Sequence, residues 1–128
     1  MAYKILVVDD EKDIVDSVSV RLQREGYEVA VAYDGEEALL QVKEADPDVL
    51  LLDLMMPKLN GFEVLKTLRE ELTDKWRPVI IVSANGALES LKKGYSLEAD
   101  LYLTKPCSLE MLLKGIKTML SLIPLRIK

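Results

Sequence analysis

The chain has 128 residues, of which 49% are apolar and 30% are charged, and its formal net charge is −5. This length and balance are typical of one globular domain with its own hydrophobic core. The negative charge argues against direct binding of nucleic acid or of an anionic membrane surface, because both need a basic face. No apolar run approaches the roughly 20 residues of a membrane span, so we expect a cytoplasmic protein without membrane contacts.

Two residue types that often carry chemistry are scarce in this sequence. The chain has no histidine, so it offers no imidazole for acid–base catalysis, metal binding or phosphohistidine formation. Its one cysteine, Cys107, has no partner for an internal disulfide, which fits a reducing compartment. Any histidine in the chemistry of this protein must therefore belong to a partner.

Short apolar runs and amphipathic segments alternate along the chain. The apolar runs predict strands at residues 5–8, 27–31, 49–52, 79–82 and 101–103. After each run, apolar residues at helical spacing predict a helix, with Gly26 and Ser108 as caps of the first and last ones. The predicted helix at 87–95 is weakly amphipathic, because Leu88 and Leu91 are its only large apolar residues before Gly94.

Five strand–helix units in succession predict an α/β fold with one parallel sheet and helices on both faces. For five strands we expect the doubly wound order 2-1-3-4-5, which places the second strand at an edge. We assign residues 1–121 to this single domain and residues 122–128 to a short C-terminal tail.

Four of the five predicted strands end in a polar or charged group. The first ends in Asp9 and Asp10, the third in Asp53, the fourth in Ser83 and the fifth in Lys105. These four strands are consecutive neighbours in the predicted order, so their carboxyl ends should bring the side chains into one crevice. Taken alone, Asp53 has a simpler interpretation as the cap of a turn. The recurrence at four strand ends favours a functional site.

The residue types at these strand ends indicate phosphoryl transfer. Two carboxylates about 4 Å apart repel by roughly 4 kcal/mol at an effective dielectric near 20, and a cation among them would remove that repulsion. Oxygen ligands without histidine or cysteine favour a hard ion, which is Mg²⁺ when phosphate is involved. Lys105 and Ser83 could bind an anion, and Asp53 is the best nucleophile candidate because it is central and isolated.

The sequence around these positions resembles the receiver domain of bacterial two-component response regulators. The resemblance rests on the segments VDDE (8–11), LDLMMP (52–57), SA (83–84) and YLTKP (102–106), together with Gly61. It extends from about residue 4 to about residue 120. It implies a flavodoxin-like three-layer sandwich and a phosphorylation-dependent signalling receiver, similar to stand-alone chemotaxis regulators. Such a receiver catalyses only its own phosphoryl transfer and dephosphorylation.

The resemblance also implies a role for each acid at the strand ends. Asp53 would accept a phosphoryl group from a sensor histidine kinase or a phosphotransfer protein. Mg²⁺ would be held by Asp10, Asp53 and the backbone carbonyl of Met55. Asp9 would contribute to the metal site mainly through a bound water.

The same resemblance implies how the site signals. Lys105 would contact the phosphoryl group, and Ser83 would hydrogen-bond it once it has formed. Tyr102 would change rotamer as Ser83 moves inward, and the peptide bond between Lys105 and Pro106 would be cis. The fourth helix, fifth strand and fifth helix would together form the surface that a downstream protein target recognises.

Three positions depart from the usual pattern of the family. Glu98 stands where a glycine is common before the fifth strand, so we expect that turn to be built differently. Met55 and Asn85 each lie two residues beyond a key site residue, at positions that help to set the phosphoryl lifetime in the family.

Other functions stay open from the sequence. The chain could be the receiver part of a larger DNA-binding response regulator, which a longer gene product would decide. It could also be an aspartate-nucleophile phosphatase of the dehalogenase-like kind, although those enzymes usually carry a second aspartate two residues after the nucleophile, where this chain has Met55. A binding scaffold without phosphorylation is the third alternative, and the complete set of site residues counts against it.

Overall fold

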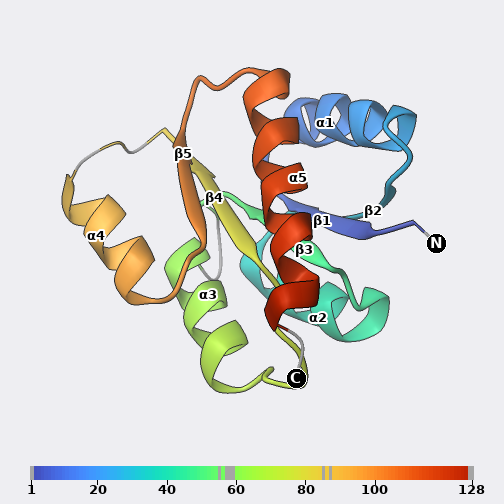
Figure 1. Cartoon of the computed structure of the whole chain (residues 1–128). Coiled ribbons are helices and arrows are strands. Elements are labelled where there is room, and N and C mark those ends of the chain that lie inside the picture. Colours follow the sequence, from blue (N-terminus) through green and yellow to red (C-terminus); the bar gives the residue numbers. More distant parts are fainter. Residues whose placement is uncertain (1, 55, 57–59, 85, 87, 127–128) are drawn as a thin grey trace.

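The computed structural model describes residues 2–54, 56, 60–84, 86 and 88–126. Strands and helices alternate along the chain (Figure 1) in the order β1 (Lys4–Val8), α1 (Lys12–Arg24), β2 (Glu28–Ala32), α2 (Gly35–Ala45), β3 (Val49–Leu52), α3 (Gly61–Glu70), β4 (Val79–Ser83), α4 (Leu88–Ser96), β5 (Leu101–Thr104) and α5 (Leu109–Arg126). The predicted succession of strand–helix units is confirmed.

The strands form one parallel sheet in the order β2-β1-β3-β4-β5, as predicted. In this register Val8, the last residue of β1, pairs with Leu52, the last residue of β3. Ser83 at the end of β4 pairs with Thr104 at the end of β5. The residues that follow these strands therefore emerge together along the carboxyl edge of the sheet.

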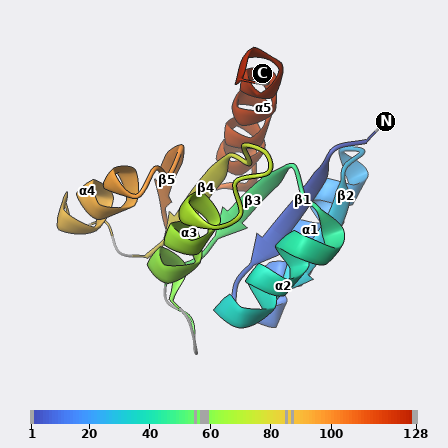
Figure 2. The ribbon, with the colours of Figure 1, turned by 90° about the horizontal axis from the view of Figure 1, so that it is seen from below.

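Successive side chains of the strands enter two separate hydrophobic clusters, one on each face of the sheet. One cluster joins the sheet to α2 and α3, and the other joins it to α1 and α5. In Figure 2, α5 and α3 accordingly lie on opposite sides of the strands. All residues of β3 are buried, as the continuous apolar run predicts for a central strand covered on both faces.

The predicted caps occur where the sequence indicates them. Gly26 follows α1 with φ +94°, in the left-handed region that glycine adopts without strain. The Oγ of Ser108 accepts a hydrogen bond from the backbone N–H of Met111 at 3.1 Å, which caps α5. α5 continues through Arg126, because Leu122 and Ile123 extend its apolar stripe onto the core. The division between a domain at 1–121 and a tail at 122–128 stays a prediction.

α4 lies at the outer end of the sheet beside β5 (Figure 1). The prediction that this helix is weakly amphipathic is wrong, because apolar and polar residues are separated on α4 about as clearly as on α3. What α4 lacks is burial, since Gly94 is the one buried residue among those of α4 whose side-chain burial the structure describes. Glu98 in the turn to β5 has φ +68°, a conformation that glycine would adopt more easily. Among the described residues, no helix is long and apolar enough to cross a membrane.

Candidate functional site

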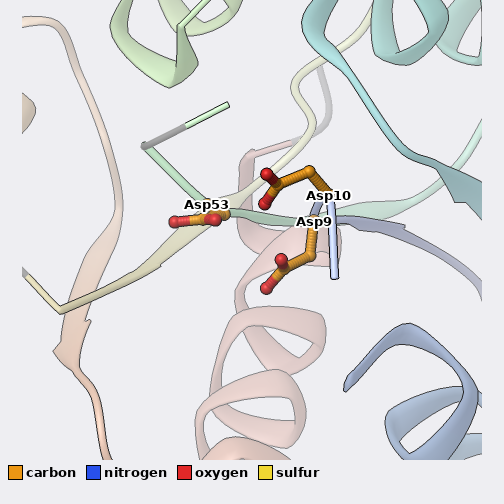
Figure 3. A group of neighbouring side chains, drawn as sticks. All are labelled: Asp9, Asp10 and Asp53. Carbon is orange, nitrogen blue, oxygen red and sulfur yellow. The ribbon is translucent and has the colours of Figure 1, made fainter. Parts of the chain in front are cut away.

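Three aspartates meet at the carboxyl edge of the sheet, just beyond β1 and β3 (Figure 3). One carboxylate oxygen from each of Asp9, Asp10 and Asp53 lies within 4.8 Å of the other two. Asp9 is 4% exposed and Asp53 is 6% exposed, whereas Asp10 is open to solvent. The structure therefore brings the three predicted carboxylates together, and it buries two of them.

The backbone holds the two buried acids in place by extending the pattern of the sheet. The N–H of Asp9 donates to the carbonyl of Ala32 on β2 at 3.2 Å, and the N–H of Asp53 donates to the carbonyl of Val8 on β1 at 3.0 Å. Both residues are thus fixed directly beyond the strand ends, where the rigid sheet rather than a loop determines their positions.

Lys105 reaches across from the end of β5 to both buried acids. Its Nζ donates to Asp9 Oδ2 at 2.9 Å and lies 3.9 Å from Asp53 Oδ2. Burial by itself lowers the pKa of Lys105, but the hydrogen bond to Asp9 and the charges of the neighbouring acids outweigh that effect, so its pKa is raised. Lys105 therefore stays charged beside the carboxylates.

The two buried carboxylates have different partners. Asp9 Oδ1 accepts a hydrogen bond from the backbone N–H of Glu11 at 3.0 Å, and its Oδ2 accepts one from Lys105 at 2.9 Å. Both oxygens of Asp9 are thus engaged in holding the start of α1 and Lys105. Asp53 directly follows the central strand β3, within reach of Lys105 and of both acids that follow β1.

Ser83 occupies the end of β4, between the strands that carry Asp53 and Lys105. It is fully buried, and its backbone carbonyl accepts a hydrogen bond from the N–H of Lys105 at 2.8 Å. The peptide bond between Lys105 and Pro106 is cis, as predicted. The backbone of Ser83 therefore helps to fix the point from which the Lys105 side chain leaves β5.

The remaining predicted residues are placed less completely. Tyr102 is 6% exposed, so its ring lies inside the molecule. Met55 and Asn85 lie outside the described residues, and the proposed carbonyl ligand of Met55 stays a prediction. Sequence reasoning missed Tyr95, whose hydroxyl accepts a hydrogen bond from the N–H of Tyr102 at 3.2 Å. No local pattern indicates this contact, because it depends on how α4 lies against β5.

The chemistry of this donor set fits a hard divalent cation. The cluster offers carboxylate oxygens and no nitrogen or sulfur ligand, and it combines buried and exposed acids at one point. Three carboxylates facing one ammonium group leave two negative charges unbalanced among these four side chains. A divalent cation held by Asp9, Asp10 and Asp53 would balance that surplus.

Comparison with known proteins gives one consistent result. The response regulator receiver domain family matches residues 5–117. The receiver domain of a Francisella response regulator, 1452, is 36% identical with a TM-score of 0.86, covering 93% of this chain and 97% of that one. The chemotaxis response regulator CheY4 of Vibrio cholerae is also 36% identical with a TM-score of 0.86, covering 93% and 99%.

A longer protein is similar to the chain over part of its own length. DrrB of Thermotoga maritima, described as an OmpR/PhoB homologue, is 36% identical with a TM-score of 0.84. The similarity covers 94% of this chain but 54% of DrrB. The same domain thus occurs both as a separate chain and as part of a larger regulator.

Proposed function

This chain belongs to the response regulator receiver domain family and is a phosphorylation-dependent signalling receiver, and we propose that Asp53 is the residue that accepts the phosphoryl group. The observation that carries this assignment is the position of Asp53 directly after the central strand, next to Asp9 and Asp10 and 3.9 Å from Lys105 Nζ. The oxygens of Asp9 already bind Glu11 and Lys105, which suits Asp9 to positioning rather than to attack.

In the proposed reaction a carboxylate oxygen of Asp53 attacks the phosphorus of a phosphohistidine on a partner protein. The new O–P bond forms as the P–N bond breaks, and the electron pair of that bond stays with the imidazole. The donor histidine must come from the partner, a sensor histidine kinase or a phosphotransfer protein, because this chain has no histidine. The chain supplies alignment and charge compensation, which account for most of the catalysis in phosphoryl transfer.

Lys105 and Ser83 are the groups that would respond to the new phosphoryl group. Phosphorylation adds about 1.5–2 negative charges and three acceptor oxygens. Lys105 carries a raised pKa and already lies near Asp53, so it would pair with these oxygens. Ser83, buried at the end of the neighbouring strand, would offer its hydroxyl.

Asp9, Asp10 and Asp53 would hold Mg²⁺, with the carbonyl of Met55 as a further ligand. When bound, Mg²⁺ neutralises charge on the oxygens of the transferring group. The chain itself keeps two of these carboxylates buried and rigid, so the site needs little rearrangement when the phosphoryl group is transferred.

An apolar groove beside the site suits the approach of the phosphoryl donor. It measures about 450 Å³ and is lined by Lys105 and by residues of α1 and α5, among them Ile14, Val18 and Leu112. The surface of α4, β5 and α5 is the proposed contact for the downstream target, since β5 carries Tyr102 and leads directly into Lys105. We further propose that the protein acts in the cytoplasm and that its catalysis is limited to its own phosphorylation and dephosphorylation.

Intact-mass measurement after incubation with acetyl phosphate and Mg²⁺ tests the proposed function. The wild-type chain should gain one base-labile phosphoryl group, and Asp53→Asn should gain none. Asp74→Asn is the matched control, because it removes one carboxylate at the opposite end of the sheet and should leave the adduct unchanged. Equal labelling of Asp53→Asn and wild type would contradict the assignment. Turnover of a phosphoester substrate would instead favour a phosphatase.

A further inference from the structure

α4 makes few described contacts with the rest of the protein, and two of its adjacent residues contact Tyr102. Lys93 Nζ lies 4.6 Å from the centroid of the Phe62 ring, which links α4 to α3. Leu91 is partly buried against the core. The next two positions are Gly94, where an added Cβ would meet Ile81 and Tyr102, and Tyr95, whose hydroxyl binds the backbone of Tyr102 on β5.

Gly94 provides the space that the Tyr102 ring occupies. A Cβ built on Gly94 would lie 3.2 Å from Tyr102 Cδ2 and 3.0 Å from Ile81 Cδ1, which is closer than ordinary van der Waals contact. A larger residue at position 94 would therefore push against the ring. Because the ring is 6% exposed, it sits beneath α4 only as long as this space stays open.

Tyr95 holds the backbone of the same residue. Its hydroxyl oxygen accepts the N–H of Tyr102 at 3.2 Å, and Tyr95 itself is 47% exposed. A side chain so exposed adds little to the core, so this hydrogen bond is the main described contact of its polar end. Gly94 and Tyr95 thus both position Tyr102. Gly94 leaves room for its ring, and Tyr95 accepts a hydrogen bond from its backbone N–H.

We propose that Gly94 and Tyr95 are positioning residues for Tyr102: Gly94 leaves the space for its buried ring, Tyr95 holds its backbone, and displacing Tyr102 from this position changes the rate of phosphorylation. The part about phosphorylation, called the coupling below, rests on the proposed function. Tyr102 lies on β5, and the last residue of that strand, Thr104, pairs with Ser83 and directly precedes Lys105. A shift of Ser83 or Lys105 towards a phosphoryl group therefore passes along β5 to the residue that α4 holds.

The chain offers a matched control for the space beneath Gly94. Gly115 of α5 faces the other side of the sheet, where a Cβ would lie 3.0 Å from Leu101 Cδ2 and 3.7 Å from Ile80 Cδ1. Gly94→Ala and Gly115→Ala gain the same helix propensity. In both variants the new Cβ would lie 3.0 Å from its nearest neighbouring atom. Only Gly94→Ala acts on Tyr102.

The first arm of the test uses the full chain without any phosphoryl donor. In NMR spectra, Gly94→Ala should abolish the cross-peaks between the Tyr102 ring and the Ile81 methyl groups, and Gly115→Ala should keep them. Tyr95→Phe should speed hydrogen exchange at the Tyr102 amide by about threefold to tenfold, the range expected for loss of one hydrogen bond. Tyr3→Phe, at an exposed tyrosine before β1, should have no effect.

The second arm measures the rate of phosphorylation by acetyl phosphate. Gly94→Ala should change this rate by about twofold or more, and Gly115→Ala should stay near wild type. Wild-type cross-peaks and exchange in both Gly94→Ala and Tyr95→Phe would overturn the proposal, as would equal rate changes in the two alanine variants. If the wild-type chain takes up no phosphoryl group, the proposed function and the coupling both fail. The first arm then decides separately whether Gly94 and Tyr95 hold Tyr102.

Discussion

The two edges of the sheet differ in how far their positive and negative charges balance. At the carboxyl edge, Asp9, Asp10 and Asp53 face Lys105 and leave a surplus of negative charge. At the amino edge, among the described residues, three bases form ion pairs with four acids: Arg69, Lys75 and Arg77 with Asp46, Asp48, Asp74 and Asp100. The backbone N–H of Lys4 also donates to Asp48. The ion pairs of the amino edge stabilise the fold, and the surplus negative charge of the carboxyl edge suits the binding of a cation.

Arg77 lies at the centre of the charge network at the amino edge. It is 3% exposed, and its guanidinium donates to the carbonyl of Pro47 at 3.2 Å, to Asp46 at 2.6 Å and to Asp74 at 3.0 and 3.1 Å. The carbonyl of Arg77 accepts from Arg69 at 2.8 Å. These contacts tie the turns before β3 and β4 to α3, so the amino edge is held by a network rather than by isolated pairs.

Removing Arg77 should give the largest loss of stability. Arg77→Met keeps much of the buried volume but removes every guanidinium contact, so we expect the free energy of unfolding to fall by about 2–4 kcal/mol. Lys75→Ala removes an exposed partner of the same Asp46 and should cost under about 1 kcal/mol. Urea denaturation followed by circular dichroism measures both, and equal effects would mean that burial does not distinguish these pairs.

Neutralising one acid at each edge should change stability in opposite directions. Asp53→Asn relieves repulsion among buried carboxylates, and we expect it to raise the free energy of unfolding by about 1–2 kcal/mol in buffer without divalent ions. Asp74→Asn should lower it, because it removes a partner of Arg77. Added Mg²⁺ should stabilise the wild-type chain more than Asp53→Asn, by linkage. A loss of stability in Asp53→Asn would contradict the unbalanced charge at this edge.

The backbone of the amino edge also departs from the right-handed region. Asp46 and Glu98 have positive φ, as does Gly26, and each lies between a helix and the next strand. Glu98→Gly should therefore stabilise the chain by about 1 kcal/mol. Gly26→Ala, where a Cβ meets nothing within 4 Å, should destabilise it by a similar amount through the backbone alone. Melting temperatures measure both, and the same sign in both variants would contradict the argument.

Acid should weaken the amino edge first, by a small amount. Hydrogen bonds to Arg77 lower the pKa of Asp46 and of Asp74 below the ordinary value of 3.8 for an aspartate. Their contribution is therefore complete above that pH and is lost as the pH falls towards the lower folded-state pKa values. Because both side chains are mostly exposed, we expect about 0.5 kcal/mol from each. We expect the difference in the free energy of unfolding between wild type and Asp74→Asn to shrink between roughly pH 5 and pH 3. A difference that stays constant over this range would contradict the role of Asp74 as a charged partner of Arg77.

Most of the fold follows from the sequence pattern alone. The apolar run at 49–52 and the caps at Gly26 and Ser108 are local signals, and the structure confirms each of them. The sequence does not predict that α5 continues to Arg126. Leu122 and Ile123 pack against the cluster on the α1 and α5 side of the sheet, and this contact is known only once the fold is known.

The site could be predicted as far as its residues follow the ends of strands. Asp9, Asp53 and Lys105 converge because parallel register places them together. Arg77 and Tyr95 could not be found in this way. Their contacts join segments that are distant in sequence or depend on how a helix lies over a strand, and no spacing in the sequence indicates either one.

Mapping the phosphorylated residue tests the central claim most directly. After reaction with acetyl phosphate and Mg²⁺, borohydride reduces an acyl phosphate of aspartate to homoserine, which peptide mass spectrometry locates. We predict homoserine at Asp53 and at no other acid of the chain. Homoserine at Asp9 or Asp10, or homoserine spread equally over the acids of both edges, would contradict the assignment of Asp53 at the carboxyl edge as the phosphoryl acceptor.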